Sequence, residues 1–248
     1  MTVLKRLLKY FVLIFLLPLA VHAAWWTYKD PGGSWNQADW SSANLLPAAS
    51  RKPEAMVHIY AARVGRWRGI FADHTWIVVK ERGGSEYTRW DKTFWANPIK
   101  INNWKADALW YGHTPVLVGR VEGPEAEKLI PQIRIAIGKY PHRQPGGYHV
   151  WPGPNSNSFV AHVLRSVPSI GIPMPPTAIG KDFRTDGWLF GRSPSGTGYE
   201  VSLFGFASAT IGWAEGFEIS ILGLTVGIDV RRPAIKLPGF GRIGMNAV

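Results

Sequence analysis

The stretch GPNSNSFVAHVLRSVP, residues 153–168, decides how the chain is expected to fold. Asn155 fits the N-cap position of a helix and Pro168 stops it, so the pattern predicts a helix that starts at Ser156. Four residues recur at helical spacing and share one face: Ser156, Val160, Val163 and Val167. Ser156 therefore heads the stripe that must pack inward, whereas a residue that only caps a helix usually faces outward.

A second helix is predicted before this one. Residues 123–141, GPEAEKLIPQIRIAIGKYP, open with Gly-Pro, carry Glu125 and Glu127 in the first turn and place Lys139 just before a proline. Leucine and isoleucine at helical spacing form the buried stripe. Pro131 lies inside this pattern and is expected to kink the helix, because it lacks the N–H that the helix needs.

Four strands are predicted ahead of the helices, at residues 55–64, 70–82, 85–95 and 114–121. Within the second, IFADHTWIVVKER, residues alternate so that His74 shares a face with Trp76 and Val78, and Asp73 points to the opposite face. This segment thus carries a histidine on the apolar side of a strand. The preceding residues 25–53 are rich in Trp, Gly, Ser, Asn and Pro and are interpreted as a loop-rich lead-in.

The last third of the chain is rich in Gly and Pro, and we expect short strands and turns there, with a hairpin around Gly223. The apolar stretch 204–228 is interrupted too often by Gly to span a membrane as a helix, but it could rest on a membrane surface. No linker divides residues 24–248, so they are interpreted as one α+β domain. We expect an antiparallel sheet packed by two or three helices, with a loop-rich β extension at the C-terminus.

The N-terminus has the pattern of an export signal. Lys5, Arg6 and Lys9 precede an apolar run of 12 residues, 10–21, which ends in Val-His-Ala-Ala. That run is shorter than the ~20 residues that a spanning helix needs. We therefore interpret residues 1–23 as a signal peptide cleaved after Ala23 or Ala24, or as an N-terminal anchor. Either reading places the protein in the periplasm or cell envelope.

Charge and cysteine content limit the partners. The net charge of +11 favours anionic partners, either a cell-wall polymer or an anionic membrane surface. Nucleic acid is disfavoured because the basic residues are scattered and no aromatic RNA-binding signature is present. The absence of cysteine excludes disulfides and thiolate catalysis. The histidines show no metal-ligand spacing, so neither a metal nor a cofactor is expected.

The order of the two polar residues suggests a site. His74 on a strand comes first, and Ser156 at a helix start comes later. This layout resembles the papain-like hydrolases in a circularly permuted order, with a nucleophile at a helix N-terminus and a histidine on a neighbouring strand. The helix end would stabilise a developing anion and the imidazole would take the proton.

Several long blocks carry a more specific resemblance: HTWIVVK, WPGPNSNSFVAHVLR, PPTAIGKDF, SPSGTGYEVSLFG and GIDVRRPAIKLPG. Together they resemble a bacterial family of unknown function, number 3750 in the domain-of-unknown-function series, from about residue 56 to residue 244. A more distant similarity is to permuted NlpC-type papain-like proteins, whose motif is Asn-Cys followed by an aromatic. Asn155, Ser156 and Phe159 occupy that motif, with serine in the place of cysteine.

The distant resemblance implies a hydrolase or acyl transferase that acts on amide or ester bonds of cell-wall peptide or lipid. Ser156 would be the nucleophile and His74 its base, while Asn155, Asn157 and Lys181 would contact the substrate. A serine hydroxyl needs both a well-placed base and oxyanion donors. Two carboxylates could orient His74, either Glu86 or Asp91. The alternative is a non-catalytic binding or scaffold protein of the envelope that keeps the fold without turnover.

Overall fold

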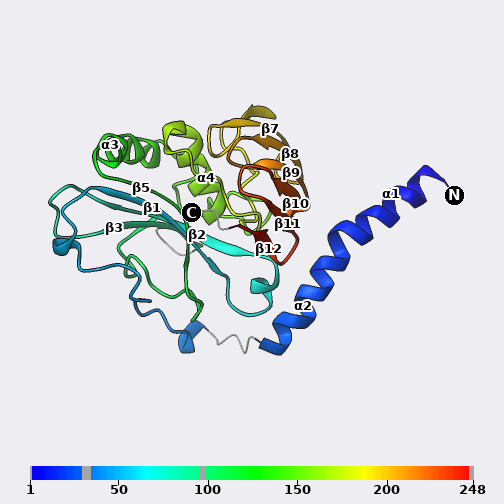
Figure 1. Ribbon diagram of the computed structural model, residues 1–248, viewed down its shortest axis with the longest axis horizontal. Helices are drawn as coiled ribbons and strands as arrows, with labels where there is room; N and C mark the ends of the chain where they lie inside the picture. The colour runs from blue at the N-terminus through cyan, green and yellow to red at the C-terminus, as the bar shows by residue number, and fades with distance from the viewer. Residues whose placement is uncertain (1, 30–34, 95–98, 246–248) are drawn as a thin grey trace.

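The computed structural model describes residues 2–29, 35–94 and 99–245 (Figure 1). A long apolar helix at the N-terminus is followed by a body that contains two antiparallel sheets, of five and seven strands, and two principal helices. The mixed α+β class expected from the sequence is confirmed. Residues 30–34 of the expected lead-in and residue 95 of the expected third strand lie outside the described residues.

The N-terminal helix comprises α1 (Val3–Phe11), a π-helical turn η1 (Val12–Leu16) and α2 (Leu17–Lys29). As one segment it is long and apolar enough to cross a membrane, which is compatible with a signal peptide or an anchor. The prediction of a loop from residue 25 is wrong for its first residues, because the helix continues to Lys29. The reason is tertiary packing: Trp26 is buried beneath the Arg63 guanidinium, which lies 5.8 Å from its ring.

The five-stranded sheet has the order β4-β3-β2-β1-β5. Four of its strands fall where the sequence predicts strands, and the short β4 was not predicted. Their bounds are β1 (Met56–Arg63), β2 (Asp73–Lys80), β3 (Thr88–Lys92), β4 (Ile99–Ile101) and β5 (Val116–Glu122). The central strands are buried on both faces, because each face of the sheet is covered.

One face of this sheet packs against α3 (Pro124–Gly138) and α4 (Ser156–Ser166), as predicted. Their apolar stripes and the inward residues of β1 and β2 form the main core. Helix α3 runs on through Pro131, so the helix is not interrupted there. Pro131 is exposed.

The opposite face is covered by loop segments instead of helices. Trp76 and Tyr60 of the sheet pack there against three further tryptophans. Trp40 precedes β1, and Trp104 and Trp110 lie in the connection between β4 and β5. Short 3-10 turns punctuate the connections: η2 (Trp35–Gln37), η3 (Ala49–Arg51), η4 (Arg66–Ile70) and η5 (Pro168–Ile170). The tryptophans of this second core therefore act as packing residues, a role that their large apolar area favours.

The seven-stranded sheet is a meander with the order β12-β11-β10-β9-β8-β7-β6. Its bounds are β6 (Phe190–Arg192), β7 (Gly198–Leu203), β8 (Ala207–Gly212), β9 (Gly216–Ile221), β10 (Leu224–Asp229), β11 (Ala234–Leu237) and β12 (Gly241–Gly244). The hairpin predicted around Gly223 is confirmed, since β9 pairs with β10. Leu222 and Gly223 both have positive φ, as the tightest two-residue hairpin turns require.

Buried ion pairs, in place of an apolar layer, join this sheet to the rest of the body. Lys181 bonds Glu218 of β9 at 2.7 Å, and Arg165 of α4 bonds Glu200 of β7 at 2.8 Å. The inner face of the sheet is consequently polar, a point that bears on its outer face below.

Candidate functional site

His74 belongs to a chain of buried polar groups on neighbouring strands β2 and β3. Its Nε2 lies 2.8 Å from Asp91 Oδ1. Both Asp91 oxygens also accept hydrogen bonds from the Arg89 guanidinium, each at 2.7 Å. The sequence left Glu86 and Asp91 open as partners of His74. The structure selects Asp91, since Glu86 is exposed and precedes β3.

Aromatic rings fix the geometry of this chain. The imidazole of His74 stacks on Trp110 with ring centroids 3.8 Å apart and planes at 8°. The Arg89 guanidinium lies 4.0 Å from the centre of the Trp76 ring. With one face and one nitrogen of the imidazole held, its orientation is set before any ligand arrives.

Burial controls protonation here. It lowers the pKa of His74, and the bond to Asp91 only partly opposes that shift. Burial alone would raise the pKa of Asp91, but the charge of Arg89 and the bond from His74 hold it below its ordinary value. His74 is therefore neutral and Asp91 ionised near pH 7. This is the protonation state in which Nε2 donates to the carboxylate and Nδ1 can accept a proton.

The tip of α4 is tied to β2 on both sides of His74. Asn155 caps the helix, because its side-chain oxygen accepts the N–H groups of Asn157 and Ser158 at 2.9 and 3.1 Å. The Asn157 amide donates to Asp73 O at 2.9 Å and accepts from Thr75 Oγ1 at 2.9 Å. The predicted N-cap is thereby confirmed, and Asn157 fixes the helix start against the histidine strand.

Ser156 begins this helix and is buried. The phenol oxygen of Tyr148 lies close to both its side chain and its backbone N–H. Burial raises the pKa of Tyr148, and these two Ser156 groups partly offset that rise. The charge of Arg68 also acts to lower the pKa of Tyr148 and that of Tyr111. The two phenols and this cation therefore lie within electrostatic range of the helix tip.

No hydrogen bond joins Ser156 to His74 among the residues that the structure describes. His74 lies on the tryptophan-covered face of the sheet, and α4 packs against the other face. His74 and Ser156 are each 4% exposed. In this conformation the helix tip is anchored beside the histidine strand without direct contact between serine and imidazole.

The three residues expected to contact substrate all make bonds within the chain. Asn155 and Asn157 hold the helix tip as described. Lys181 is 3% exposed and pairs with Asp182 at 2.8 Å and Glu218 at 2.7 Å. Their visible contacts are those of structural residues.

Sequence reasoning missed Arg89, Trp110 and Tyr148. Arg89 could have been found, because it lies two positions from Asp91 and so on the same strand face. Trp110 and Tyr148 carry no local signal, since each reaches the site from a loop distant in sequence.

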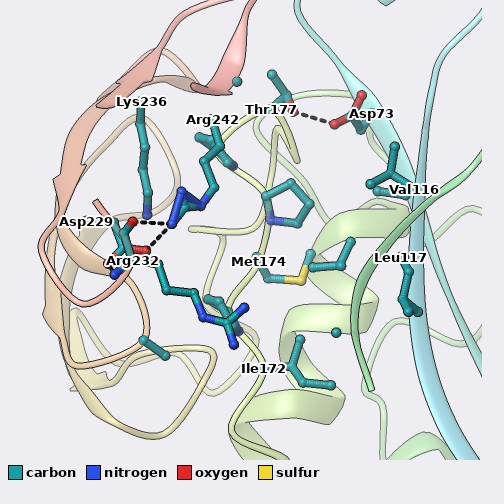
Figure 2. A pocket seen from close by; sticks show the side chains of 18 of the residues that line it. Asp73, Val116, Leu117, Ile172, Met174, Thr177, Asp229, Arg232, Lys236 and Arg242 are labelled. Carbon is teal, nitrogen blue, oxygen red and sulfur yellow. Dashed lines mark hydrogen bonds and ion pairs between the residues drawn. The ribbon is translucent and has the colours of Figure 1, made fainter. Parts of the chain in front are cut away.

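A separate cavity of about 750 Å³ lies between the two sheets (Figure 2). One wall is apolar, with Val116, Leu117, Ile172 and Met174. The other is cationic: Arg232 points into the space, and Arg242 beside it pairs with Asp229 at 2.7 Å. Ser156 and His74 do not line it.

Comparison with known proteins identifies the family of this chain. A model of the family described as "Protein of unknown function (DUF3750)" matches residues 54–183. No curated protein and no solved structure matches the chain. The matched span covers just over half of the chain, runs from the first strand of the five-stranded sheet past α4, and includes His74, Asp91 and Ser156. The chain therefore belongs to the DUF3750 family of proteins of unknown function.

Proposed function

We propose that the protein is a serine-dependent hydrolase or acyl transferase of the cell envelope, with Ser156 as nucleophile and His74 as base, in a permuted papain-like arrangement. Its substrates would be amide or ester bonds of cell-wall peptide or lipid. The observation that supports this most is the Arg89–Asp91–His74 chain. It orients a neutral imidazole through Nε2 and leaves Nδ1 as the proton acceptor, which is the arrangement that a general base needs.

The reaction would follow the usual course of acyl transfer. His74 Nδ1 takes the Ser156 hydroxyl proton as Oγ bonds to the substrate carbonyl carbon. The imidazolium then returns that proton to the leaving amine or alcohol as the acyl bond breaks. Water or an acceptor alcohol or amine, deprotonated by the same imidazole, then bonds to the acyl carbon, and the imidazolium returns that proton to Oγ as the acyl–Oγ bond breaks.

Oxyanion stabilisation would come from the helix tip. Asn155 already occupies the N–H groups of Asn157 and Ser158, so the N–H of Ser156 is the donor suited to this role once Tyr148, which contacts it here, moves away. Turnover requires Ser156 Oγ to move away from Tyr148 and within hydrogen-bonding reach of Nδ1. Because α4 and the imidazole lie on opposite faces of the five-stranded sheet, a change of the Ser156 rotamer alone is not enough, and the tie between Asn157 and β2 must loosen.

The test compares wild type with Ser156→Ala on acyl esters and wall fragments. Ser166→Ala is the matched control, since Ser166 is an exposed residue at the other end of the same helix. We expect hydrolysis by wild type and Ser166→Ala and its loss in Ser156→Ala. Equal rates in all three proteins would remove Ser156 from the mechanism.

A second candidate is a non-catalytic envelope protein that binds an anionic amphipathic ligand. The cavity favours it, because an apolar wall faces Arg232 and Arg242 while Ser156 and His74 are both sealed. Dodecyl phosphate would then raise the melting temperature of wild type and of Ser156→Ala, but raise that of Arg232→Ala less. An equal rise in all three would show that the ligand binds elsewhere.

A further inference from the structure

The seven-stranded sheet has an inverted polarity. Residues that point into the protein are polar, and Glu200, Thr210 and Glu218 are at most 2% exposed. Residues that alternate with them are large and apolar, and Ile211 is 65% exposed. An ordinary one-sided sheet buries its apolar residues and exposes its polar ones.

The exposed apolar residues continue across the whole sheet. We define the apolar sheet face as the outward residues of β6 to β12: Phe190, Tyr199, Val201, Leu203, Ile211, Phe217, Ile219, Ile228, Ile235 and Ile243. Loops at its margin add exposed aromatics, among them Trp188, Phe204 and Trp213. Continuous apolar surfaces of this extent on soluble monomers mark interaction sites.

The contacts that attach this sheet to the body lie on its inner side. The inner side attaches the sheet through ion pairs, Lys181 and Lys236 to Glu218 and Arg165 to Glu200. The apolar residues point away from those contacts, so within one chain they lie in water.

The N-terminal helix indicates what covers the face. Its middle turn, η1, packs against β10, and Phe15 of that turn is 6% exposed. Figure 1 shows β7 to β12 on the side of the body from which the helix projects. The helix can cross a bilayer and carries Lys5, Arg6 and Lys9 near its free end. With η1 against β10, the helix lies along the body instead of crossing a bilayer apart from it, so a bilayer that receives the exposed apolar side of the helix also meets this side of the body.

We propose that the apolar sheet face docks flat on the lipid bilayer that holds the N-terminal helix. The margin tryptophans fit the headgroup region, which favours amphipathic rings. The chain's charge of +11 complements an anionic lipid surface. The sheet rests at the interface and does not span, because the edge strands β6 and β12 would leave backbone groups unpaired in hydrocarbon.

The absence of cysteine makes the test direct. Ile211→Cys and Ile219→Cys, each in the full-length chain, are labelled with the environment-sensitive fluorophore NBD. Lys128→Cys is the control, because its side chain is 72% exposed on α3, outside the apolar sheet face. The labelled proteins are reconstituted into vesicles of phosphatidylethanolamine and phosphatidylglycerol, with and without doxyl-labelled lipid.

We expect emission at 211 and 219 to shift to the blue and to lose intensity with doxyl lipid, while the label at 128 does neither. Water-like emission without quenching at 211 and 219 would overturn the proposal. A blue shift that grows with the protein-to-lipid ratio and is insensitive to doxyl lipid would also overturn it, and would indicate that a second copy covers the face. Hydrolysis plays no part in this readout, so Ser156→Ala should give the same spectra.

Discussion

Glu218 is a buried carboxylate whose replacement should cost substantial stability. Its buried carboxylate accepts a hydrogen bond from Lys181 Nζ at 2.7 Å and another from Lys236 Nζ. Burial alone would raise the pKa of Glu218, but the two ammonium groups hold it below its ordinary value. Both lysines are nearly as buried as Glu218. This triad ties the seven-stranded sheet to the segment that follows α4.

The substitution Glu218→Gln keeps the shape of the side chain and removes its negative charge. Taking one partner from a buried ion pair costs about 3–5 kcal/mol, because the remaining charge stays buried and uncompensated. Lys181 retains Asp182 at 2.8 Å. Lys236 keeps only its bond to the Glu215 carbonyl among the contacts described. We therefore expect a loss near the lower limit, about 3 kcal/mol.

The assay is guanidinium unfolding of the detergent-solubilised full chain, followed by tryptophan fluorescence. The control is Glu127→Gln, whose exposed carboxylate lies 3.7 Å from Arg82 and should contribute less than about 1 kcal/mol. The double variant Glu218→Gln/Lys236→Met should recover much of the lost stability, because it also removes the Lys236 ammonium that would otherwise stay buried without a carboxylate partner. If Glu218→Gln matched Glu127→Gln, the triad would not hold the seven-stranded sheet to the segment that follows α4.

Three further predictions concern stability. Burial lowers the pKa of Lys92 from 10.5 to about 8. Between pH 8 and 10.5 the unfolded chain binds a proton that the folded chain does not, so the free energy of unfolding should rise with pH in that range. Lys92→Met should abolish that rise when unfolding is titrated at several pH values. Gly180→Ala should destabilise by about 2–4 kcal/mol, because φ is +93° and the new Cβ would lie 2.2 Å from Asn155 Nδ2; a circular dichroism melt that matches wild type would refute this. Phe159→Ala should cost about 3–5 kcal/mol by denaturation, since the ring is fully buried, while Ser166→Ala should be near neutral.

The parts predicted best are those with strong local signals. The helix at Ser156–Ser166 starts and ends where Asn155 and the residues before Pro168 indicate. The strand with His74 was found because its alternation matches a covered sheet. Asp91 stayed one of two alternatives, since a single sequence does not report which carboxylate reaches the imidazole.

The rest depended on tertiary structure. The second core is assembled by Trp40 from the segment before β1 and by Trp104 and Trp110 from the connection between β4 and β5, and no periodic pattern in the sequence indicates it. The C-terminal strands were anticipated, but their union into one sheet was not, because apolar residues on the outward side give the same alternation as apolar residues facing a core. The π-helical turn at Val12–Leu16 has no sequence signal at all.

The coupling of Ser156 to His74 is tested most directly in a chain without other cysteines. Ser156→Cys is alkylated with iodoacetamide across pH, alone and with His74→Ala. If the imidazole and the helix N-terminus act on this position, the thiol pKa should fall below its ordinary value of about 8.5 and return toward it when His74 is removed. A thiol that titrates at or above 8.5 and does not respond to His74→Ala would contradict the proposed nucleophile and base.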